Sequence, residues 1–148
     1  MKFDSPFTIE IDHDAKKQID LDPRGAYGRI TIGDFWENFY MSPSIWKIED
    51  YVKQWNLTWK HLETHDTSVF VANVQLNPMV ILWPLYKIEN NIYIQNAFII
   101  SKSYKKMIGK NPYTPKTSFL YIPKRDNTPT KFGKQILKPS EWEVKIIP

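Results

Sequence analysis

The segment from Ile45 to Thr64 constrains the fold most, because its apolar residues recur at the spacing of one helix face. At roughly 100° per residue these apolar side chains form a single stripe, and Lys53 and Lys60 point away from it. Ser42-Pro43-Ser44 precedes the segment as a start signal, and two acids lie in its first turn, where the helix dipole favours them. The pattern predicts one amphipathic helix over about residues 45–64. Its buried stripe is expected to consist of Ile48, Tyr51, Val52, Trp55, Trp59 and Leu62.

Most other apolar segments are short and have the alternation or the β-branched composition of strands. Asp22–Gly25 and Glu89–Asn91 are predicted turns, and Pro84 marks an edge or a bulge. Because 148 residues fit one core, we expect residues 1–148 to form a single α+β domain, with an antiparallel-rich sheet packed against the helix. The expected strands are Phe7–Ile11, Tyr27–Ile32, Ser68–Val74, Met79–Trp83, Leu85–Ile88, Ile92–Ile100, Ser118–Ile122 and Trp142–Ile147, with a short helix over Ser103–Ile108.

Composition argues against several classes of protein. The chain has no cysteine, which excludes disulfides, thiol catalysis and thiolate metal sites and suits a reducing cytosol. The N-terminal residues lack the apolar core of a secretory signal, and the longest apolar run, Met79–Tyr86, is too short to span a bilayer. We therefore expect a soluble cytoplasmic protein without a membrane segment.

Motifs for catalysis or cofactor binding are missing from the sequence. It has no phosphate-binding glycine loop, no Gly-x-Ser-x-Gly elbow and no Cys–His pair. His61 and His65 have the spacing of two metal ligands on a helix, but no third ligand is evident beyond Asp66 or the distant His13. Two solvated histidines at a helix end are the simpler interpretation. We therefore assign no catalytic, cofactor-binding or metal-binding residue and no small-molecule substrate, and expect a protein that is not an enzyme.

Aromatic and charged residues point instead to binding. Five aromatic residues lie between Phe35 and Trp46, where core packing is the default interpretation and surface anchors for a partner are the alternative. Trp46 and Leu57 lie off the helix stripe, so they either pack against a second layer or bind something. Residues 1–50 contain ten acids and six bases, whereas residues 101–148 contain three acids and eleven bases. This asymmetry can steer a charged partner.

Seven segments carry aromatic, acidic, amide and proline residues, and the aromatic and acidic stretch within residues 33–55 is the most distinctive of them. They are Gly33–Ser42, Trp46–Trp55, Trp83–Tyr86, Ile92–Asn96, Gly109–Pro115, Tyr121–Pro123 and Ser140–Trp142. Together they span about residues 30–145 and resemble the immunity proteins of bacterial contact-dependent growth inhibition, the CdiI group. The resemblance implies a non-catalytic protein that binds the C-terminal toxin domain of a cognate effector in the producing cell and neutralises it. Because many such toxins are nucleases, it also implies occlusion of a nuclease site.

An inhibitor of a basic nuclease domain is expected to present carboxylates that imitate phosphate and speed association. The predicted toxin-binding residues are therefore acids of the first half of the chain, Asp12, Asp14, Asp20, Asp22, Asp34 and Glu37. Immunity proteins that discriminate among toxins must differ at their contact surfaces, so positions that match the family pattern are assigned to structure. Trp46, Tyr51 and Trp55 belong to this structural group.

Two other functions are compatible with the sequence. A hydrolase could place a carboxylate site in an aromatic cleft, because separation in space is not visible in a sequence. A nucleic-acid-binding domain could use the basic C-terminal third, although no recognition motif accompanies it and nucleic acid is the weaker expectation. Its residues would be Lys102, Lys105, Lys106, Lys110, Lys124 and Arg125, with Tyr104, Tyr113 and Tyr121 as stacking partners.

Overall fold

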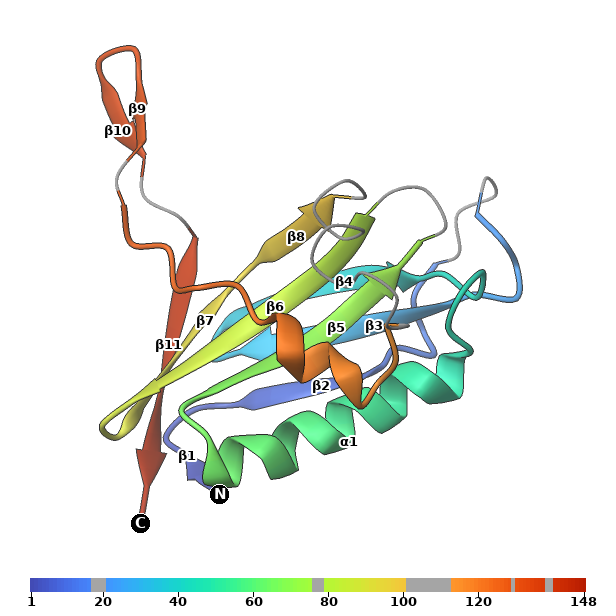
Figure 1. Cartoon of the computed structure of the whole chain (residues 1–148), viewed down its shortest axis with the longest axis horizontal. Coiled ribbons are helices and arrows are strands. Elements are labelled where there is room, and N and C mark those ends of the chain that lie inside the picture. Colours follow the sequence, from blue (N-terminus) through green and yellow to red (C-terminus); the bar gives the residue numbers. More distant parts are fainter. Residues whose placement is uncertain (17–20, 76–78, 101–112, 129, 138–139) are drawn as a thin grey trace.

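The computed structural model describes residues 1–16, 21–75, 79–100, 113–128, 130–137 and 140–148 (Figure 1). The elements are β1 (Lys2–Phe3), β2 (Phe7–Ile11), β3 (Ala26–Ile32), β4 (Phe35–Met41), α1 (Ile48–Thr64), β5 (Thr67–Val74), β6 (Met79–Ile88), β7 (Asn91–Gln95), β8 (Ala97–Ile100), the 3₁₀ helix η1 (Thr117–Tyr121), β9 (Thr130–Phe132), β10 (Gln135–Leu137) and β11 (Glu141–Ile147). All strand pairs are antiparallel. The predicted α+β class is therefore confirmed.

The strands form a large sheet, a small sheet and a separate hairpin. The large sheet has the order β1-β11-β7-β6-β5, and β8 also pairs with β6. The small sheet has the order β2-β3-β4, and β9 and β10 pair with each other as a hairpin. No helix in the described part of the chain has the length and apolar character that crossing a membrane requires.

Helix α1 covers the edge strand β5 through hydrogen bonds from its side chains. The Gln54 amide donates to the Val69 carbonyl (Nε2···O 2.7 Å) and accepts from the Val71 amide (Oε1···N 2.9 Å). Thr58 Oγ1 also donates to the Val69 carbonyl at 2.6 Å, and Trp55 Nε1 donates to the Val71 carbonyl at 2.8 Å. These bonds satisfy backbone groups that an edge strand would otherwise offer to another chain.

The apolar stripe predicted for the helix faces the core. Its residues are either buried or half-buried against the core cluster: Tyr51, Trp55 and Leu62 are buried, and Ile48, Val52 and Trp59 pack against them. The helix begins at Ile48 instead of Ile45, because Lys47 is the N-cap and its backbone N–H donates to the Asp50 carboxylate at 2.9 Å. The predicted start signal at Ser42–Ser44 is therefore wrong by one turn, whereas the predicted end at Thr64 is confirmed.

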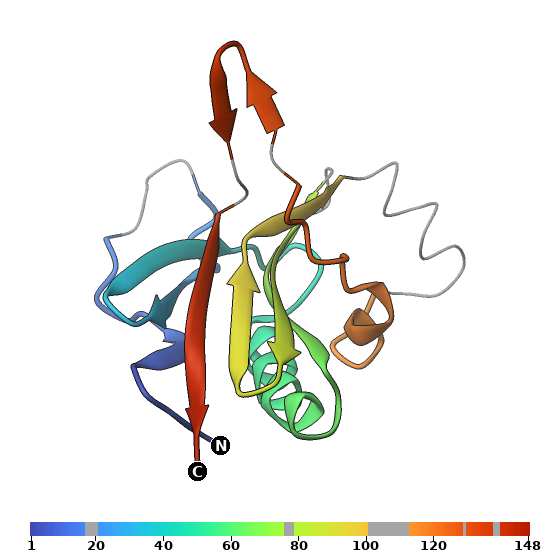
Figure 2. The same ribbon diagram turned by 90° about the vertical axis from the view of Figure 1, so that its left-hand side faces the viewer.

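The small sheet packs on one face of the large sheet (Figure 2). Aromatic residues of both sheets belong to the hydrophobic cluster between them. Phe35 of β4 stacks on Trp142 of β11, with ring centroids 4.4 Å apart. Phe39 meets Trp55 of α1 edge-on at 5.9 Å, which joins the small sheet to the helix. The core therefore lies between the two sheets, and β4 supplies alternate residues to it.

The opposite face of the large sheet is covered by residues 113–128, which include η1 (Figure 2). Tyr86 donates its hydroxyl proton to the Pro123 carbonyl (O···O 2.5 Å). Gln95 pairs with the Asp126 backbone through both of its amide atoms, at 2.7 and 3.1 Å. The segment is thus held to the sheet by side-chain bonds to its backbone.

Two segments fold differently from the prediction. Residues 35–41 were not expected to form a strand, yet they are β4. Residues 118–122 were expected to form a strand, but η1 occupies Thr117–Tyr121. Thr114 and Thr117 exchange hydrogen bonds between their side chains and backbone amides, at 2.8 and 3.2 Å, and these bonds favour a tight turn over an extended chain.

Pro84 lies inside one continuous strand instead of separating two. On one side of β6, residues 79–82 pair with β8 and residues 85–88 pair with β7. The ladder is interrupted between these two sets, so proline is tolerated there. The same interruption divides the predicted strand Ile92–Ile100 into β7 and β8. The predicted helix Ser103–Ile108 lies outside the described residues.

Candidate protein-binding surface

The outer face of the small sheet carries polar and aromatic side chains that the core does not use. Because side chains alternate along a strand, Phe35 and Phe39 point inward and Trp36 and Asn38 point outward. Trp36 is 55% exposed, whereas Phe35 and Phe39 are half-buried against the core. In the register of the sheet, Trp36 lies opposite Thr31 and Asn38 lies opposite Arg29. This face is therefore accessible to a partner.

Arg29 connects three side chains on that face. Its guanidinium carbon lies 4.0 Å from the centre of the Trp36 ring, which is cation–π geometry. Its Nε lies 3.5 Å from Asp12 Oδ2, and the same carboxylate oxygen accepts a hydrogen bond from Asn38 Nδ2 at 2.6 Å. Arg29 is therefore held between a carboxylate and an aromatic ring.

The Asp12 carboxylate is part of this arrangement. The hydrogen bond from Asn38 lowers the pKa of Asp12, with smaller contributions from the Asp14 amide and the Arg29 charge, while partial burial opposes the shift. The Asp12 side chain is only 15% exposed. Asp12 therefore orients Arg29 and offers little free carboxylate to a partner.

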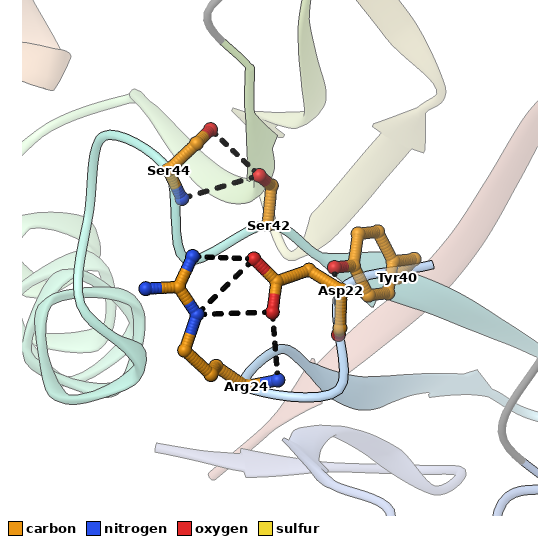
Figure 3. Close-up of polar contacts among 5 residues, drawn as sticks. All are labelled: Asp22, Arg24, Tyr40, Ser42 and Ser44. Atoms are coloured by element: carbon orange, nitrogen blue, oxygen red, sulfur yellow. Dashed lines mark hydrogen bonds and ion pairs between the residues drawn. The ribbon is translucent and has the colours of Figure 1, made fainter. Parts of the chain in front are cut away.

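Asp22 has a similar internal role in the turn before β3. Arg24 donates to both Asp22 carboxylate oxygens, from Nε at 3.0 Å and from Nη2 at 2.6 Å, and its backbone amide adds a bond of 2.9 Å (Figure 3). These bonds lower the pKa of Asp22 to about 2. The Tyr40 hydroxyl donates to the Asp22 carbonyl at 3.2 Å and so fixes the turn to β4. The predicted Asp22–Gly25 turn is confirmed by the bond from the Gly25 amide to the Asp22 carbonyl, at 3.0 Å.

Two serines hold the connection between β4 and the helix. The hydroxyls of Ser42 and Ser44 are 2.8 Å apart, and the Ser44 amide approaches Ser42 Oγ at 3.3 Å (Figure 3). The Ser42 amide donates to Asn73 Oδ1 and its carbonyl accepts from the Tyr51 hydroxyl, at 2.9 and 2.8 Å. The two serines therefore shape this connection and do not cap α1.

The other predicted acids have freer side chains. Asp14, Asp34 and Glu37 are exposed, and their carboxylates make no hydrogen bond or ion pair with any residue that the structure describes. Asp34 lies in the two-residue turn between β3 and β4, where only Gly33 has a positive φ (+60°), as a type II′ turn requires. Asp20 lies outside the described residues. The six predicted acids thus do not form one cluster of free carboxylates.

Glu37 lines a groove at the boundary between the two sheets. The groove has a volume of about 470 Å³, and residues of β4, β6 and β8 contribute to it. Phe98 of β8 lies at this groove with 65% of its surface exposed. The groove therefore combines an acidic side chain with an exposed aromatic one.

The residues proposed for nucleic-acid binding do not form a free basic surface where the structure describes them. Arg125 binds both oxygens of Glu141, at 2.9 and 2.7 Å, and its guanidinium lies 4.1 Å from the Tyr93 ring centre. Tyr113 is buried and stacks on Trp46 at 5.6 Å. Lys102, Tyr104, Lys105, Lys106 and Lys110 lie outside the described residues.

Trp46 and the histidines also have structural partners. Trp46 is buried and donates its indole N–H to the Tyr113 carbonyl at 2.9 Å, so it packs against a second layer of the fold. The rings of His61 and His65 stack 3.8 Å apart, and Phe119 covers the other side of His61 at 4.5 Å. Burial, together with the neighbouring His65, lowers the pKa of His61. His61 is therefore not the solvated side chain that the sequence predicted, although His65 is exposed. Across the described ranges, no three acidic or histidine side chains are grouped as metal ligands.

The sequence model of the family described as the CdiI N-terminal domain matches residues 41–147, more than half of the chain. The chain belongs to this family. The resemblance to the immunity proteins of contact-dependent growth inhibition is thereby confirmed. A search of curated proteins finds no match.

A solved structure described as "CdiA-CT/CdiI toxin and immunity complex from Enterobacter cloacae" contains a similar chain. The TM-score is 0.70 at 20% sequence identity, and the alignment covers 95% of this chain and 91% of the other. At this identity the likeness shows the fold. Because 95% of this chain aligns, the shared fold includes most of the small sheet, which the family match does not cover.

Sequence reasoning missed the pairing of Arg29 with Trp36. The two residues are seven positions apart, and only the β3–β4 register brings them together. The available signal was Gly33-Asp34, a glycine-first dipeptide of the kind that closes two-residue hairpins. Recognising that turn would have placed Trp36 on a strand and paired it with β3.

Proposed function

We propose that this protein binds the C-terminal toxin domain of a cognate contact-dependent growth inhibition effector and neutralises it in the cytoplasm of the producing cell. The observation that carries the proposal is membership of the CdiI family. The fold shared with a chain from a toxin and immunity complex supports a toxin domain as the partner. The protein then acts as a binding inhibitor and not as an enzyme.

We further propose that the toxin is a nuclease and that the immunity protein covers its basic site with carboxylates. Asp14, Asp34 and Glu37 support this idea, because they are exposed and free of internal bonds among the described residues. Carboxylates placed opposite a basic site accelerate association and make it sensitive to salt. Asp12 and Asp22 would support the surface indirectly, through Arg29 and Arg24. Asp20 completes the proposed acidic set.

The first experiment is co-purification of the tagged protein with the C-terminal domain of the effector encoded directly upstream. The expected result is stoichiometric recovery together with loss of that domain's toxicity in cells. Nuclease activity of the isolated domain, tested on RNA and DNA with and without the immunity protein, then checks the proposed target class. A correctly folded protein that neither binds nor protects would contradict the proposal, and retention on mixed oligonucleotides at moderate salt would favour the nucleic-acid alternative.

Charge reversal tests the acidic contacts. Asp34→Lys combined with Glu37→Lys is expected to slow association at low salt by tenfold or more, because complementary charge acts mainly on the association rate. Glu49→Lys combined with Glu89→Lys is the matched control, since both acids are exposed and lie outside the small sheet. Equal association rates and equal salt dependence for the two double variants would remove Asp34 and Glu37 from the interface.

A further inference from the structure

We propose that Trp36, held by Arg29 on the outer face of the small sheet, is the central anchor of the toxin interface. This inference rests on the proposed function and names the surface that carries it. The partner is the toxin domain, and the docking surface is defined by Arg29, Thr31, Trp36 and Asn38, with Glu10 and Asp12 beside them.

The exposure of Trp36 is a consequence of the strand register. Phe35 stacks on Trp142 and Phe39 packs on Trp55 from the inward-facing side of β4, whereas Trp36 lies on the opposite side of the strand. Trp36 makes its described ring contact with Arg29 on the outer face. An exposed Trp contributes little to folding, whereas Trp is among the residues most enriched at the energetic centres of protein interfaces.

The surroundings of Trp36 restrict its motion before binding. The Arg29 guanidinium lies over the ring at 4.0 Å, and Arg29 is itself held by Asp12. Asn38 fixes Asp12 through the 2.6 Å hydrogen bond, so the ring belongs to a connected set of four side chains. Side chains that are ordered in the free protein lose less entropy on binding, which increases affinity without new contacts.

The place of this face in the fold suits contact with a toxin. Trp36 lies in the segment Gly33–Ser42, whose positions were assigned to structure because they resemble the family, but its ring is 55% exposed and contacts Arg29 on the outer face. The solved relative has a similar fold over most of the small sheet. Side chains on an exposed sheet face can change without disturbing the core, which suits selection of one toxin among many, because specificity requires contacts that differ between relatives.

Charge supports the same occupant. Glu10 and Asp14 lie at the β2 side of the face, and Asp34 lies at its hairpin end, whereas the charges of Arg29 and Asp12 are already paired with each other. An aromatic centre with an acidic rim fits a basic protein surface such as that of a nuclease. A second copy of this chain would place acidic rims opposite each other, which disfavours self-association through this face.

The test compares single variants for toxin affinity by calorimetry and for stability by thermal melting. Trp36→Ala is expected to weaken binding by about 30-fold or more, the range of a central interface residue, and to leave the melting temperature within a few degrees of wild type. Arg29→Lys keeps the charge and loses the planar stacking, so it should weaken binding about three- to tenfold. Leu120→Ala is the matched control, because this 69% exposed side chain lies on η1, across the large sheet.

The outcomes separate this inference from the proposed function. Wild-type protein that fails to bind the toxin contradicts the proposed function itself. If wild type binds and Trp36→Ala binds within threefold of it, the anchor assignment is wrong while the function stands. Loss of affinity in Phe98→Ala without loss in Trp36→Ala would move the interface to the groove at β8. A concentration-dependent dimer that Trp36→Ala abolishes, with toxin affinity unchanged, would overturn the toxin as occupant.

Discussion

Replacing Gln54 provides a direct test of how α1 closes the edge of the large sheet. Gln54 is completely buried on a helix whose buried stripe is otherwise mostly apolar. Its amide spans two residues of β5, donating to Val69 and accepting from Val71. It also donates to Ser118 Oγ at 3.2 Å. The Gln54 amide thus pairs with β5 in the way that a backbone amide of a neighbouring strand would.

The expected loss of stability in Gln54→Met depends on which hydrogen-bond partners of Gln54 keep another hydrogen bond. In Gln54→Met, the Val69 carbonyl retains its bond from Thr58, and Ser118 Oγ retains its bond to the Pro115 carbonyl. The Val71 N–H is left without its acceptor in a buried site, which costs about 1–3 kcal/mol. Methionine nearly conserves the volume, so any cavity contribution is small. The variant should be less stable by about 1–3 kcal/mol, which corresponds to a fall of about 3–10 °C in Tm for a chain of this size.

Urea unfolding gives the free energy, and amide hydrogen exchange locates the effect. The Val71 amide should exchange faster in Gln54→Met by more than the global loss of stability explains, because its own acceptor has been removed. Asn56→Met is the control, since Asn56 is exposed on the same helix and should change the free energy of unfolding by less than about 0.5 kcal/mol. A Gln54→Met protein as stable as this control, with unchanged Val71 protection, would refute the role assigned to Gln54.

Three further substitutions test other parts of the fold. Trp55→Ala should lower the free energy of unfolding by about 3–5 kcal/mol in urea titrations, because it empties a buried aromatic site and removes an indole bond to β5; a change below 1 kcal/mol would contradict its structural assignment. Gly28→Ala should cost about 1–3 kcal/mol, since a Cβ there would overlap the Phe39 ring, and normal stability would show that the ring moves freely. The pKa of His61 is lowered on folding, so the unfolded chain takes up the proton first and stability should decline as pH falls below about 6.5. His61→Gln should reduce that decline between pH 7.5 and 5.5 in thermal melts, and an unchanged pH profile would exclude His61 as its source.

The sequence predicts elements well where one pattern dominates. The stripe of α1 and the strands at residues 7–11 and 26–32 follow from helical spacing and from alternation. β4 is different, because Trp36 and Tyr40 face outward while Phe35 and Phe39 face inward. Aromatic residues on both faces remove the alternation that identifies a strand. The sequence therefore predicts only an aromatic cluster before the helix, whereas the structure shows that residues 35–41 form an edge strand of the small sheet.

Local hydrogen bonding explains the error at residues 118–122. Their composition is that of a strand, but composition does not report that Thr114 and Thr117 bond to each other's backbone. For the same reason, the sequence does not reveal which polar residues of the helix are buried. Gln54 and Thr58 would be assigned to the solvent face by polarity, and only the position of β5 makes them buried. Polar side chains that replace strand pairing cannot be identified until their backbone partners are placed.

The candidate interface depends on the same kind of long-range information. Asp12 and Asp22 are acids in sequence, but their carboxylates are committed to Arg29 and Arg24 in the fold. Counting charges therefore overestimates the acidic surface available to a toxin. Trp36 shows the opposite error, because its neighbours suggested core packing and the register places it outside.

The bonds that hold α1 to the large sheet and the proposed toxin contacts lie in different parts of the fold, and this separation affects how specificity can change. Helix α1 and the large sheet from β5 to β11 lie within the residues that the family model matches, and the bonds of Gln54, Thr58 and Trp55 hold α1 to β5. The outer face of the small sheet takes no part in those bonds. Substitutions at Trp36 or Asn38 can therefore alter recognition while inward residues such as Phe35 preserve the core. A scaffold of this kind can acquire a new partner without first losing stability, because its contact and core positions alternate along one strand.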